Sequence, residues 1–287
     1  MKLGIIGQGF VGSAMYEGLK NFYEICTYDL DKAKCNSTHQ EVCYQSDIIF
    51  VCVPTPMRKS GECDTRILED VIEKINAECC NDSNRNRPIL VIKSTVPPGT
   101  TQRINKEIAT VLNVCFSPEF LTEANSFDDF KNQSRIILGG DPDINCTAAR
   151  KVKSMFRKPF PTTPIVVTKS ETAEMVKYFT NCFLATKVIF ANEMYQVCES
   201  AKIDYDKVLE YVLYDTRFGK THLSVPGPDG DLGFGGHCFP KDLSALIHFA
   251  DALETDCSLL KSARSKNEEV RRNKDWKEML GRAVTDD

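Results

Sequence analysis

Three glycines near the start of the chain constrain its fold more than any other feature. Gly7, Gly9 and Gly12 form a Gly-x-Gly-x-x-Gly motif that directly follows an apolar run, Lys2–Ile6, and opens a helix-like segment. In that context the first glycine permits a tight turn, the second lets a pyrophosphate approach the backbone, and the third allows close helix–strand packing. The phosphates would lie on the helix N-terminus, where amides and the helix dipole favour anions. The motif predicts dinucleotide binding; the alternative is a glycine turn without a ligand.

An acidic residue at the end of the second apolar run selects between the two common dinucleotides. Asp29 stands 17 residues after Gly12. A carboxylate there accepts hydrogen bonds from the adenosine ribose hydroxyls and would repel a 2′-phosphate. The position therefore predicts NAD rather than NADP.

The first part of the chain alternates short apolar runs with amphipathic stretches, as in Asp64–Ala77 and Thr100–Leu112. The apolar runs lack polar alternation, which is typical of strands buried on both faces of a parallel sheet. Strands that alternate with helices predict an α/β fold with a Rossmann-type, doubly wound parallel sheet. The predicted strands are Lys2–Ile6, Ile25–Tyr28, Asp47–Val53, Pro88–Lys93, Asn113–Phe116 and Arg135–Leu138.

The pattern changes near residue 170. Ser170 begins a stretch without glycine or proline that runs to about Lys202 and predicts one long helix. Shorter helices are predicted at Tyr205–Leu213 and Asp242–Leu253, and a charged, helix-like tail follows. We therefore predict an NAD-binding domain over residues 1–170 and a mostly helical central domain over residues 171–287. The polar stretch Asn81–Arg87 is predicted to be a surface loop.

Composition excludes several functional classes. The net charge of −4 gives no electrostatic reason to expect nucleic acid or an anionic membrane as a partner. No apolar run approaches the roughly 20 residues of a membrane span, and a strand at Lys2 leaves no room for a signal peptide, so a cytoplasmic protein is expected. The thirteen cysteines include no Cys-x-x-Cys pair, which argues against zinc and against a disulfide scaffold. We expect no metal site.

Three polar loops follow predicted strands, at the sheet edge where ligands bind in open α/β folds. They are Val53–Pro56, Ser94–Thr100 and Ser117–Glu123. The third loop carries two carboxylates, Glu119 and Glu123, either of which could act as a general base or position a water. Ordinary turn chemistry is the alternative for the first two loops. For the third, acids at a helix start could simply favour the dipole, an alternative that fits Glu123 better than Glu119.

Two further groups of residues suggest catalysis. Lys177 and Asn181 stand four residues apart, so they share one helix face and could stabilise an oxyanion; the alternative is a solvated lysine beside a polar neighbour. Cys238 lies in the glycine-rich run Gly233–Asp242, just before a helix start, where the helix N-terminus and Lys241 would favour a thiolate. A buried structural thiol is the alternative for Cys238.

These segments, in this order, resemble the UDP-glucose/GDP-mannose dehydrogenase family from residue 1 to about residue 270. The resemblance is most specific in the run Gly-Phe-Gly-Gly-x-Cys-Phe-Pro-Lys-Asp around Cys238, in Ser117–Glu123 and in the helix of Lys177 and Asn181. It implies a four-electron oxidation of a nucleotide sugar, with UDP-glucose expected, at C6. The alcohol gives an aldehyde, which Cys238 captures as a thiohemiacetal; a second hydride transfer to NAD gives a thioester, which water hydrolyses to the uronate.

The resemblance also implies roles for the matching residues. Lys177 and Asn181 would supply oxyanion contacts. Thr95 and Glu123 would help to position the water, while Asp242 would activate it or assist proton transfer. The implied catalytic residues are Cys238, Lys177, Asn181, Asp242, Glu123 and Thr95. The implied NAD contacts are Gly7, Gly9, Phe10, Val11, Gly12, Asp29, Lys34, Val53, Pro54, Thr55, Thr95, Glu123 and Lys241. The implied substrate contacts are Glu119, Phe120, Leu121, Lys177, Asn181, Arg217, Phe234 and Gly235.

The resemblance further implies assembly. Arg217 resembles an arginine that reaches the substrate of a neighbouring subunit, and the long helix resembles the family's dimer helix, so a homodimer or larger homo-oligomer is expected through residues 171–202.

The sequence departs from the family pattern in two places. Family members usually continue into a second α/β domain that holds the nucleotide of the substrate, whereas this sequence stops at Asp287. The substrate would then be held by the remaining domains and a neighbouring subunit, or another chain would supply the domain, or activity would be weak. The segment Val225–Gly230 lengthens the loop before Cys238 and could contribute substrate contacts. Two other functional hypotheses remain. One is a two-electron dehydrogenase of the 6-phosphogluconate or 3-hydroxyacid type, and the other is an NAD-binding protein without catalysis.

Overall fold

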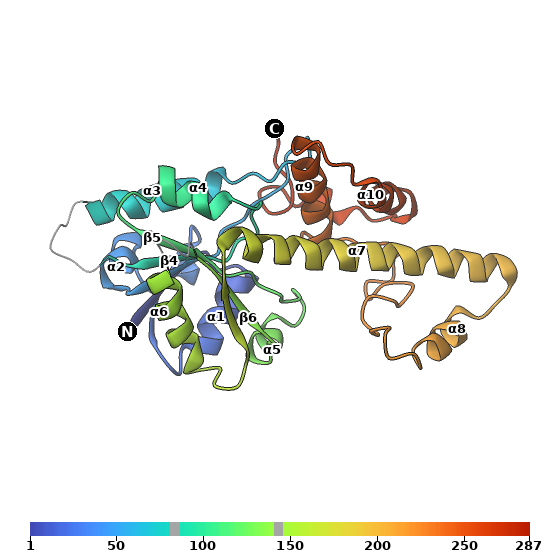
Figure 1. Ribbon diagram of the computed structural model, residues 1–287, viewed down its shortest axis with the longest axis horizontal. Coiled ribbons are helices and arrows are strands. Elements are labelled where there is room, and N and C mark those ends of the chain that lie inside the picture. Colours follow the sequence, from blue (N-terminus) through green and yellow to red (C-terminus); the bar gives the residue numbers. More distant parts are fainter. Residues whose placement is uncertain (81–86, 141–145) are drawn as a thin grey trace. The chain divides into compact units, whose positions relative to one another are not determined.

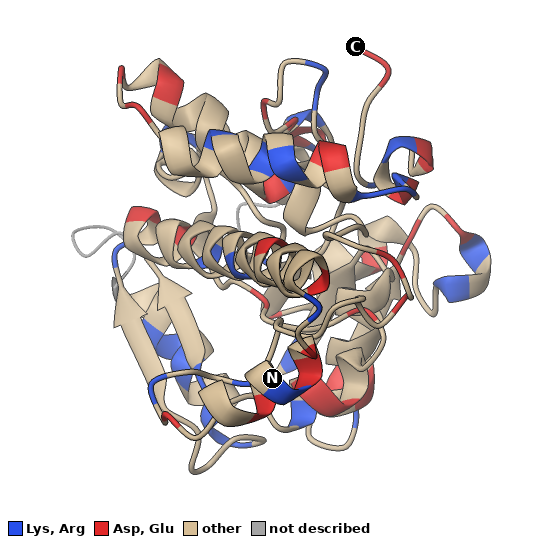
Figure 2. Ribbon diagram, turned by 90° about the vertical axis from the view of Figure 1, so that its right-hand side faces the viewer, with Lys and Arg blue, Asp and Glu red and all other residues tan. Residues whose placement is uncertain are grey.

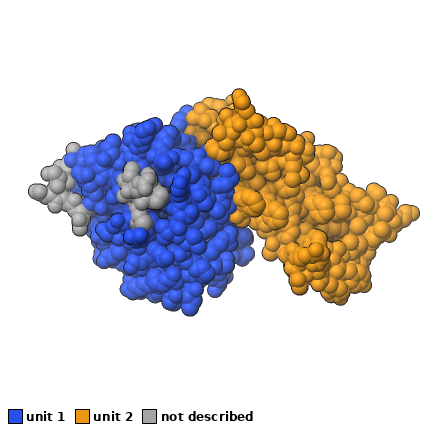
Figure 3. Space-filling model, viewed as in Figure 1, with its two compact units in different colours: residues 1–55, 65–177 blue, residues 56–64, 178–287 orange. Residues whose placement is uncertain are grey.

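The computed structural model describes residues 1–80, 87–140 and 146–287, and it divides into two compact units. Unit 1 comprises residues 1–55 and 65–177, and unit 2 comprises residues 56–64 and 178–287 (Figure 3). The long helix α7 (Ser170–Ala201) contributes its first two turns to unit 1 and the remainder to unit 2. Of the predicted surface loop Asn81–Arg87, residues 81–86 lie outside the described residues.

Unit 1 is built on a seven-stranded, mostly parallel sheet, which confirms the predicted fold class. The strand order is β2-β1-β3-β4-β5-β6-β7. The strands are β1 (Lys2–Ile6), β2 (Glu24–Tyr28), β3 (Ile48–Val51), β4 (Ile89–Ile92), β5 (Asn113–Phe116), β6 (Ile136–Gly139) and β7 (Ile165–Thr168).

Two features of the sheet differ from the sequence-based expectation of six parallel strands. β5 and β6 meet antiparallel, through the single pair Phe116 and Gly139. The connection between them contains only the six-residue helix α5, and β6 begins at the end of the sheet where β5 finishes. A parallel neighbour would need a crossover back to the other end of the strands. β7 was not predicted because it is an edge strand, in which Val166 and Val167 are exposed and give no buried pattern.

Helices cover both faces of the sheet. α1, α5 and α6 pack on one face, whereas α2, α3, α4 and the start of α7 pack on the other (Figure 1). This is the doubly wound arrangement expected from alternating strands and helices. The helices of unit 1 are α1 (Phe10–Leu19), η1 (Lys32–Lys34), α2 (His39–Gln45), α3 (Arg66–Cys80), α4 (Thr100–Glu107), α5 (Ser126–Lys131) and α6 (Cys146–Arg157), with the first turns of α7.

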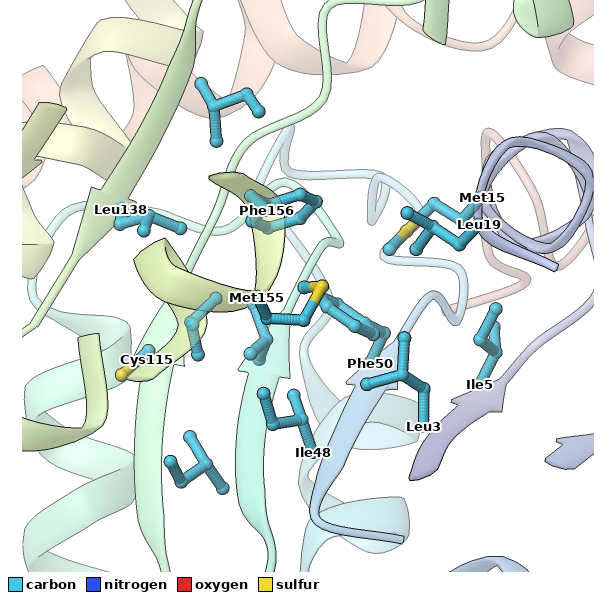
Figure 4. Packing of buried hydrophobic residues seen from close by; sticks show 14 of the residues in the cluster. Leu3, Ile5, Met15, Leu19, Ile48, Phe50, Cys115, Leu138, Met155 and Phe156 are labelled. Atoms are coloured by element: carbon cyan, nitrogen blue, oxygen red, sulfur yellow. The ribbon is translucent and has the colours of Figure 1, made fainter. Parts of the chain in front are cut away.

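The core between the sheet and the first helix layer explains why the apolar runs form strands. Leu3 and Phe50 project from neighbouring strands toward Met15 of α1 and Phe156 of α6 (Figure 4). The rings of Phe50 and Phe156 meet edge-on with centroids 5.8 Å apart. Burial of side chains of this size stabilises a fold by about 1.5–3 kcal/mol each, so the runs are fixed at the centre of the unit.

Unit 2 consists mainly of helices joined by loops. It contains the remainder of α7, α8 (Tyr205–Val212), α9 (Phe239–Ala252), α10 (Ser258–Val270) and the short η2 (Asp275–Glu278). One apolar cluster joins α7, α9 and α10, and a second joins α7, α8 and the following loop. The last residues pair with a segment far away in sequence, since the Met57 amide donates to the Ala283 carbonyl at 2.8 Å.

Charge and hydropathy add little to the functional assignment. Basic and acidic residues are interspersed along the ribbon (Figure 2). Among the residues that the structure describes, no helix is both long enough and apolar enough to cross a membrane.

Candidate active site

The glycine motif forms the turn between β1 and α1, and its three glycines occupy three different environments. Gly7 has a φ of +91°, and a Cβ there would lie 2.5 Å from the Cys52 carbonyl oxygen. A Cβ on Gly12 would lie 1.9 Å from the Gly7 oxygen. At Gly9, the residue that caps α1, a Cβ would have no neighbour within 4 Å. The turn and the packing thus require two of the glycines, while the third leaves open space at the helix N-terminus. These residues fit a bound pyrophosphate.

The carboxylate of Asp29 lies beside this turn. One of its oxygens accepts a hydrogen bond from the Gln8 amide at 2.6 Å, and the other accepts one from the Asp31 amide at 2.9 Å. The half-buried side chain is therefore held next to the glycine turn, where an adenosine ribose would be reached. Lys34 is exposed, and its Nζ lies 3.8 Å from an Asp31 carboxylate oxygen.

Side-chain bonds join the loops that follow β3 and β4. The buried Thr55 hydroxyl donates to the Thr95 carbonyl at 2.7 Å, and the Ser94 hydroxyl donates to the Val53 carbonyl at 2.6 Å. Pro54, between them, is exposed. The carboxyl ends of two neighbouring strands thus present one rigid edge beside the glycine turn.

A buried ion pair lies at the next strand end. Lys177, on α7, donates to Glu119 with 3.0 Å between Nζ and Oε1, and both side chains are less than a tenth exposed. The second Glu119 oxygen accepts the Leu121 amide at 2.6 Å. Because both charges are removed from water, their geometry must be held closely for the pair to persist. Glu123, by contrast, is exposed in the turn before α5.

A second lysine, which sequence reasoning did not identify, lies close to this pair. Lys93 directly follows β4, is 6% exposed, and donates to the Ser117 hydroxyl at 3.3 Å and to the Pro118 carbonyl at 3.2 Å. Burial lowers the pKa of Lys93 from 10.5 to about 8, although Cys52 and Glu119 act in the opposite direction. The available signal was a charged residue that ends an otherwise apolar run.

A cavity of about 270 Å³ opens between these groups. Val11 and Phe120 line it together with Lys93, Glu119 and Arg135. The Arg135 guanidinium lies 4.0 Å from the centre of the Phe120 ring, a cation–π contact that fixes the ring. The cavity therefore combines apolar walls with cations and with two carboxylates, Glu119 and Asp129. Phe10 and Leu121, which sequence reasoning assigned to the cofactor and the substrate, are half-buried, and Leu121 also lines the cavity.

In unit 2, Cys238 is the residue that caps α9, and its side chain is half-buried. The helix begins at Phe239 with Pro240 in its first turn, earlier than the predicted start at Asp242. Asp242 is 1% exposed; its carboxylate accepts hydrogen bonds from Asn181 at 2.6 Å and from Lys241.

Burial by itself would lower the pKa of Lys241. Negative charge on Asp242, and on Cys63 and Cys238 in their thiolate forms, outweighs burial and raises that pKa. Lys241 thus stays cationic close to the Cys238 sulfur, a setting that favours a thiolate.

The glycine loop before Cys238 is held by the protein itself. A Cβ on Gly235 would lie 2.4 Å from Arg271 and from Asp275, and one on Gly233 would lie 2.3 Å from Asn267. At both positions glycine therefore accommodates neighbouring side chains. Phe234 between them is buried. Arg217 lies elsewhere in the unit, with its side chain 86% exposed and paired with Asp215.

Comparison with known proteins identifies the family of this chain. The NAD binding domain of the UDP-glucose/GDP-mannose dehydrogenase family matches residues 32–159, and the family's central domain matches residues 171–269. The chain belongs to this family. It is 33% identical over 262 residues to a UDP-glucose 6-dehydrogenase of Rickettsia conorii and 36% identical over 229 residues to one of Bacillus subtilis.

Solved structures are similar as well. A UDP-glucose dehydrogenase from the archaeon Pyrobaculum islandicum superposes with a TM-score of 0.82 at 28% identity, covering 93% of this chain and 68% of that one. A 3-hydroxyisobutyrate dehydrogenase of Mycobacterium tuberculosis has a TM-score of 0.73 at 15% identity, which shows a shared fold alone; it covers 93% of this chain and 92% of that one.

The chain spans about half the length of its curated relatives in the family. It covers 56% of the Rickettsia conorii protein and 49% of the Bacillus subtilis protein, although those matches include 89% and 78% of this chain. What the complete relatives do therefore comes to this chain only as a proposal.

Proposed function

We propose that this chain catalyses the NAD-dependent, four-electron oxidation of a nucleotide sugar, UDP-glucose, at C6 to the uronate. One observation carries the proposal: a half-buried cysteine, Cys238, begins α9 beside a buried Lys241–Asp242 pair. A dehydrogenase that stops at an aldehyde or ketone needs no such thiol. Membership of the family supports the reaction class, and the glycine turn with Asp29 supports NAD.

The glycine turn and Asp29 would hold NAD, and two NAD molecules bound in turn would each take one hydride. The first transfer, with removal of the hydroxyl proton assisted by Asp242, would leave an aldehyde at C6. The Cys238 thiolate adds to the aldehyde carbon, forming a C–S bond, and the resulting oxyanion is stabilised by Lys177 and Asn181. Loss of the second hydride leaves a thioester. Water, positioned by Thr95 and Glu123 and activated by Asp242, attacks the thioester carbon, and the sulfur leaves as thiolate.

The contacts of Asp242 and Glu119 support these roles. Asp242 is fixed by Asn181 and Lys241, so its free lone pairs have a defined direction. Glu119, which lines the cavity, neutralises Lys177, so this buried cation is not an isolated charge. Glu119, Phe120 and Leu121 would contact the sugar, as would Phe234 and Gly235. The division into domains at residues 1–170 and 171–287 remains part of the proposal.

We further propose a homodimer formed through α7. Phe179, Phe183, Phe190 and Val197 are each more than half exposed, and their spacing of four and seven residues places them on one helix face. A stripe of this kind is unusual on a monomer and fits a second copy of the helix. In such a dimer the exposed Arg217 could reach the partner's substrate.

The test is the yield of NADH per sugar from purified protein with NAD and, separately, UDP-glucose, UDP-N-acetylglucosamine or GDP-mannose. Two NADH per molecule of UDP-glucose, together with the uronate as product, is the expected result. One NADH per sugar would instead indicate a two-electron dehydrogenase. No NADH from a protein that binds NAD by calorimetry would refute catalysis by this chain.

Cys238→Ser gives the sharper version of the test. It should stop acid formation while NAD affinity is unchanged, because Cys238 lies outside the unit that carries the glycine turn. Cys257→Ser is the matched control, since Cys257 is also a half-buried cysteine that caps a helix, α10. Acid production by Cys238→Ser at the rate of Cys257→Ser would exclude the thiol mechanism.

A further inference from the structure

The lengthened loop that precedes Cys238 has no part in the chemistry described above, yet it is closely fastened. The Gly227 amide donates to the Asp231 carbonyl at 2.8 Å, and the Gly230 amide donates to the Gly227 carbonyl at 2.9 Å. These bonds close the segment into a compact turn. The turn presents two carboxylates, Asp229 and Asp231, to the end of α10.

Both carboxylates form ion pairs with a single arginine, Arg271. The side chain of Arg271, immediately after α10, is 2% exposed. Its Nη2 contacts Asp229 at 2.5 Å, its Nε lies 3.6 Å from Asp231, and Nη2 lies 3.8 Å from Asp275. Nε also donates to the Asn273 carbonyl at 2.8 Å. A buried cation thus holds three acidic side chains, two from the loop and one from η2. We call Arg271 and these three acids the arginine clamp.

The clamp continues directly into the loop of the cysteine. The Gly236 amide, two residues before Cys238, donates to both carboxylate oxygens of Asp275 at 3.1 Å. Gly235 must be glycine because the clamp occupies the space of its Cβ. Arg271 therefore fixes Asp275, Asp275 fixes the backbone of Gly236, and Gly236 leads into the helix start at Cys238.

We propose that Arg271 is a positioning residue for Cys238: the arginine clamp ties the lengthened loop to η2 and so holds the sulfur at the N-terminus of α9. The proposal rests on the proposed function only in treating Cys238 as the nucleophile. Removal of Arg271 would leave three acids facing one another without a cation, so they would separate and release Gly236. Cys238 would then lose its fixed place beside the helix amides and Lys241, and less of it would be thiolate.

The test compares Arg271→Met and Arg271→Lys with the wild-type chain. Iodoacetamide labelling at neutral pH is followed by peptide mass spectrometry, which separates Cys238 from the other cysteines. Hydrogen exchange reports the loop amides. Lys261→Met is the matched control, because Lys261 is a cation on α10 that pairs with two carboxylates, Asp251 and Asp256, on the exposed surface.

Arg271→Met should speed exchange in the peptide of residues 229–238 and slow Cys238 labelling about tenfold. Arg271→Lys should restore only part of the rate, because an ammonium lacks the planar fork that serves several acceptors. Lys261→Met, and the labelling of Cys257 in every variant, should match the wild-type chain. A variant that merely weakens unit 2 would instead expose Cys257 and Cys238 alike.

Labelling of Cys238 at the wild-type rate or faster would overturn the proposal, and so would slower labelling with unchanged loop exchange. If Arg271→Met does not fold, Asp229→Asn, at a side chain that is half exposed, should give a smaller slowing in the same direction. Neither readout requires turnover. A wild-type chain without dehydrogenase activity would therefore refute the proposed function and leave this test intact.

Discussion

Replacement of Lys93 by methionine should change how the stability of unit 1 depends on pH. Lys93 is 6% exposed, and burial lowers its pKa from 10.5 to about 8. This difference corresponds to a destabilisation of the folded state by about 3 kcal/mol whenever Lys93 is charged. Methionine has a similar length and no charge, so Lys93→Met removes that cost.

The direction of this pH dependence follows from which state of the chain binds the proton at each pH. Above pH 10.5 the lysine is neutral in both the folded and the unfolded chain, so it carries no penalty. Between about pH 10.5 and about pH 8 the unfolded chain takes up the proton and the folded chain does not, so stability falls as the pH falls. Below about pH 8 both forms are charged and the full penalty is present. The hydrogen bonds of Lys93 to Ser117 and Pro118 stabilise the folded chain by roughly 1 kcal/mol each. They offset part of the cost of burial but leave the direction of the pH dependence unchanged.

The assay is urea unfolding of both proteins by circular dichroism from about pH 7 to about pH 11. The free energy of unfolding of the wild-type chain, minus that of Lys93→Met, should rise by about 3 kcal/mol across this range. All other titrating groups are common to both proteins, so the difference isolates Lys93. Fluorescence of Trp276, in unit 2, serves as the internal control. A difference that does not vary with pH would refute the argument that Lys93 is charged and buried at neutral pH.

Three further outcomes are expected. Gly7→Ala should lower the free energy of unfolding by about 1–3 kcal/mol and weaken NAD binding. The reason is that the φ of +91° at Gly7 and the Cys52 carbonyl, 2.5 Å from the position of a Cβ, leave no room for a side chain. An unchanged NAD affinity in calorimetry would contradict this. Glu174→Ala should lower the melting temperature by removing a fully buried acceptor of the Thr101 amide and hydroxyl at 2.8 and 2.6 Å, whereas Glu174→Gln should lower it less. Phe183→Glu should halve the mass measured by light scattering; a wild-type monomer would disprove the dimer.

Local sequence signals predicted most of unit 1. The strand runs were recognisable because a strand buried on both faces must be apolar throughout, and the glycine turn because only glycine fits a positive φ with a carbonyl at 2.5 Å. The edge strand β7 was missed because exposed valines give no burial pattern. The antiparallel entry of β6 was missed because strand direction depends on where the chain passes in space.

The candidate site, too, was predicted only in part from the sequence. The sequence by itself placed Glu119 after a strand, Lys177 on one face of the long helix and Cys238 before a helix start, because residue type and spacing encode those positions. Only the tertiary structure brought Lys177 to Glu119 across 58 residues, Asn181 to Asp242 across 61, and Arg271 to Asp229 across 42. The electrostatics of Lys93 and Arg271 were likewise absent from the sequence pattern, since burial of a charge and the partners that compensate it exist only after distant elements have packed.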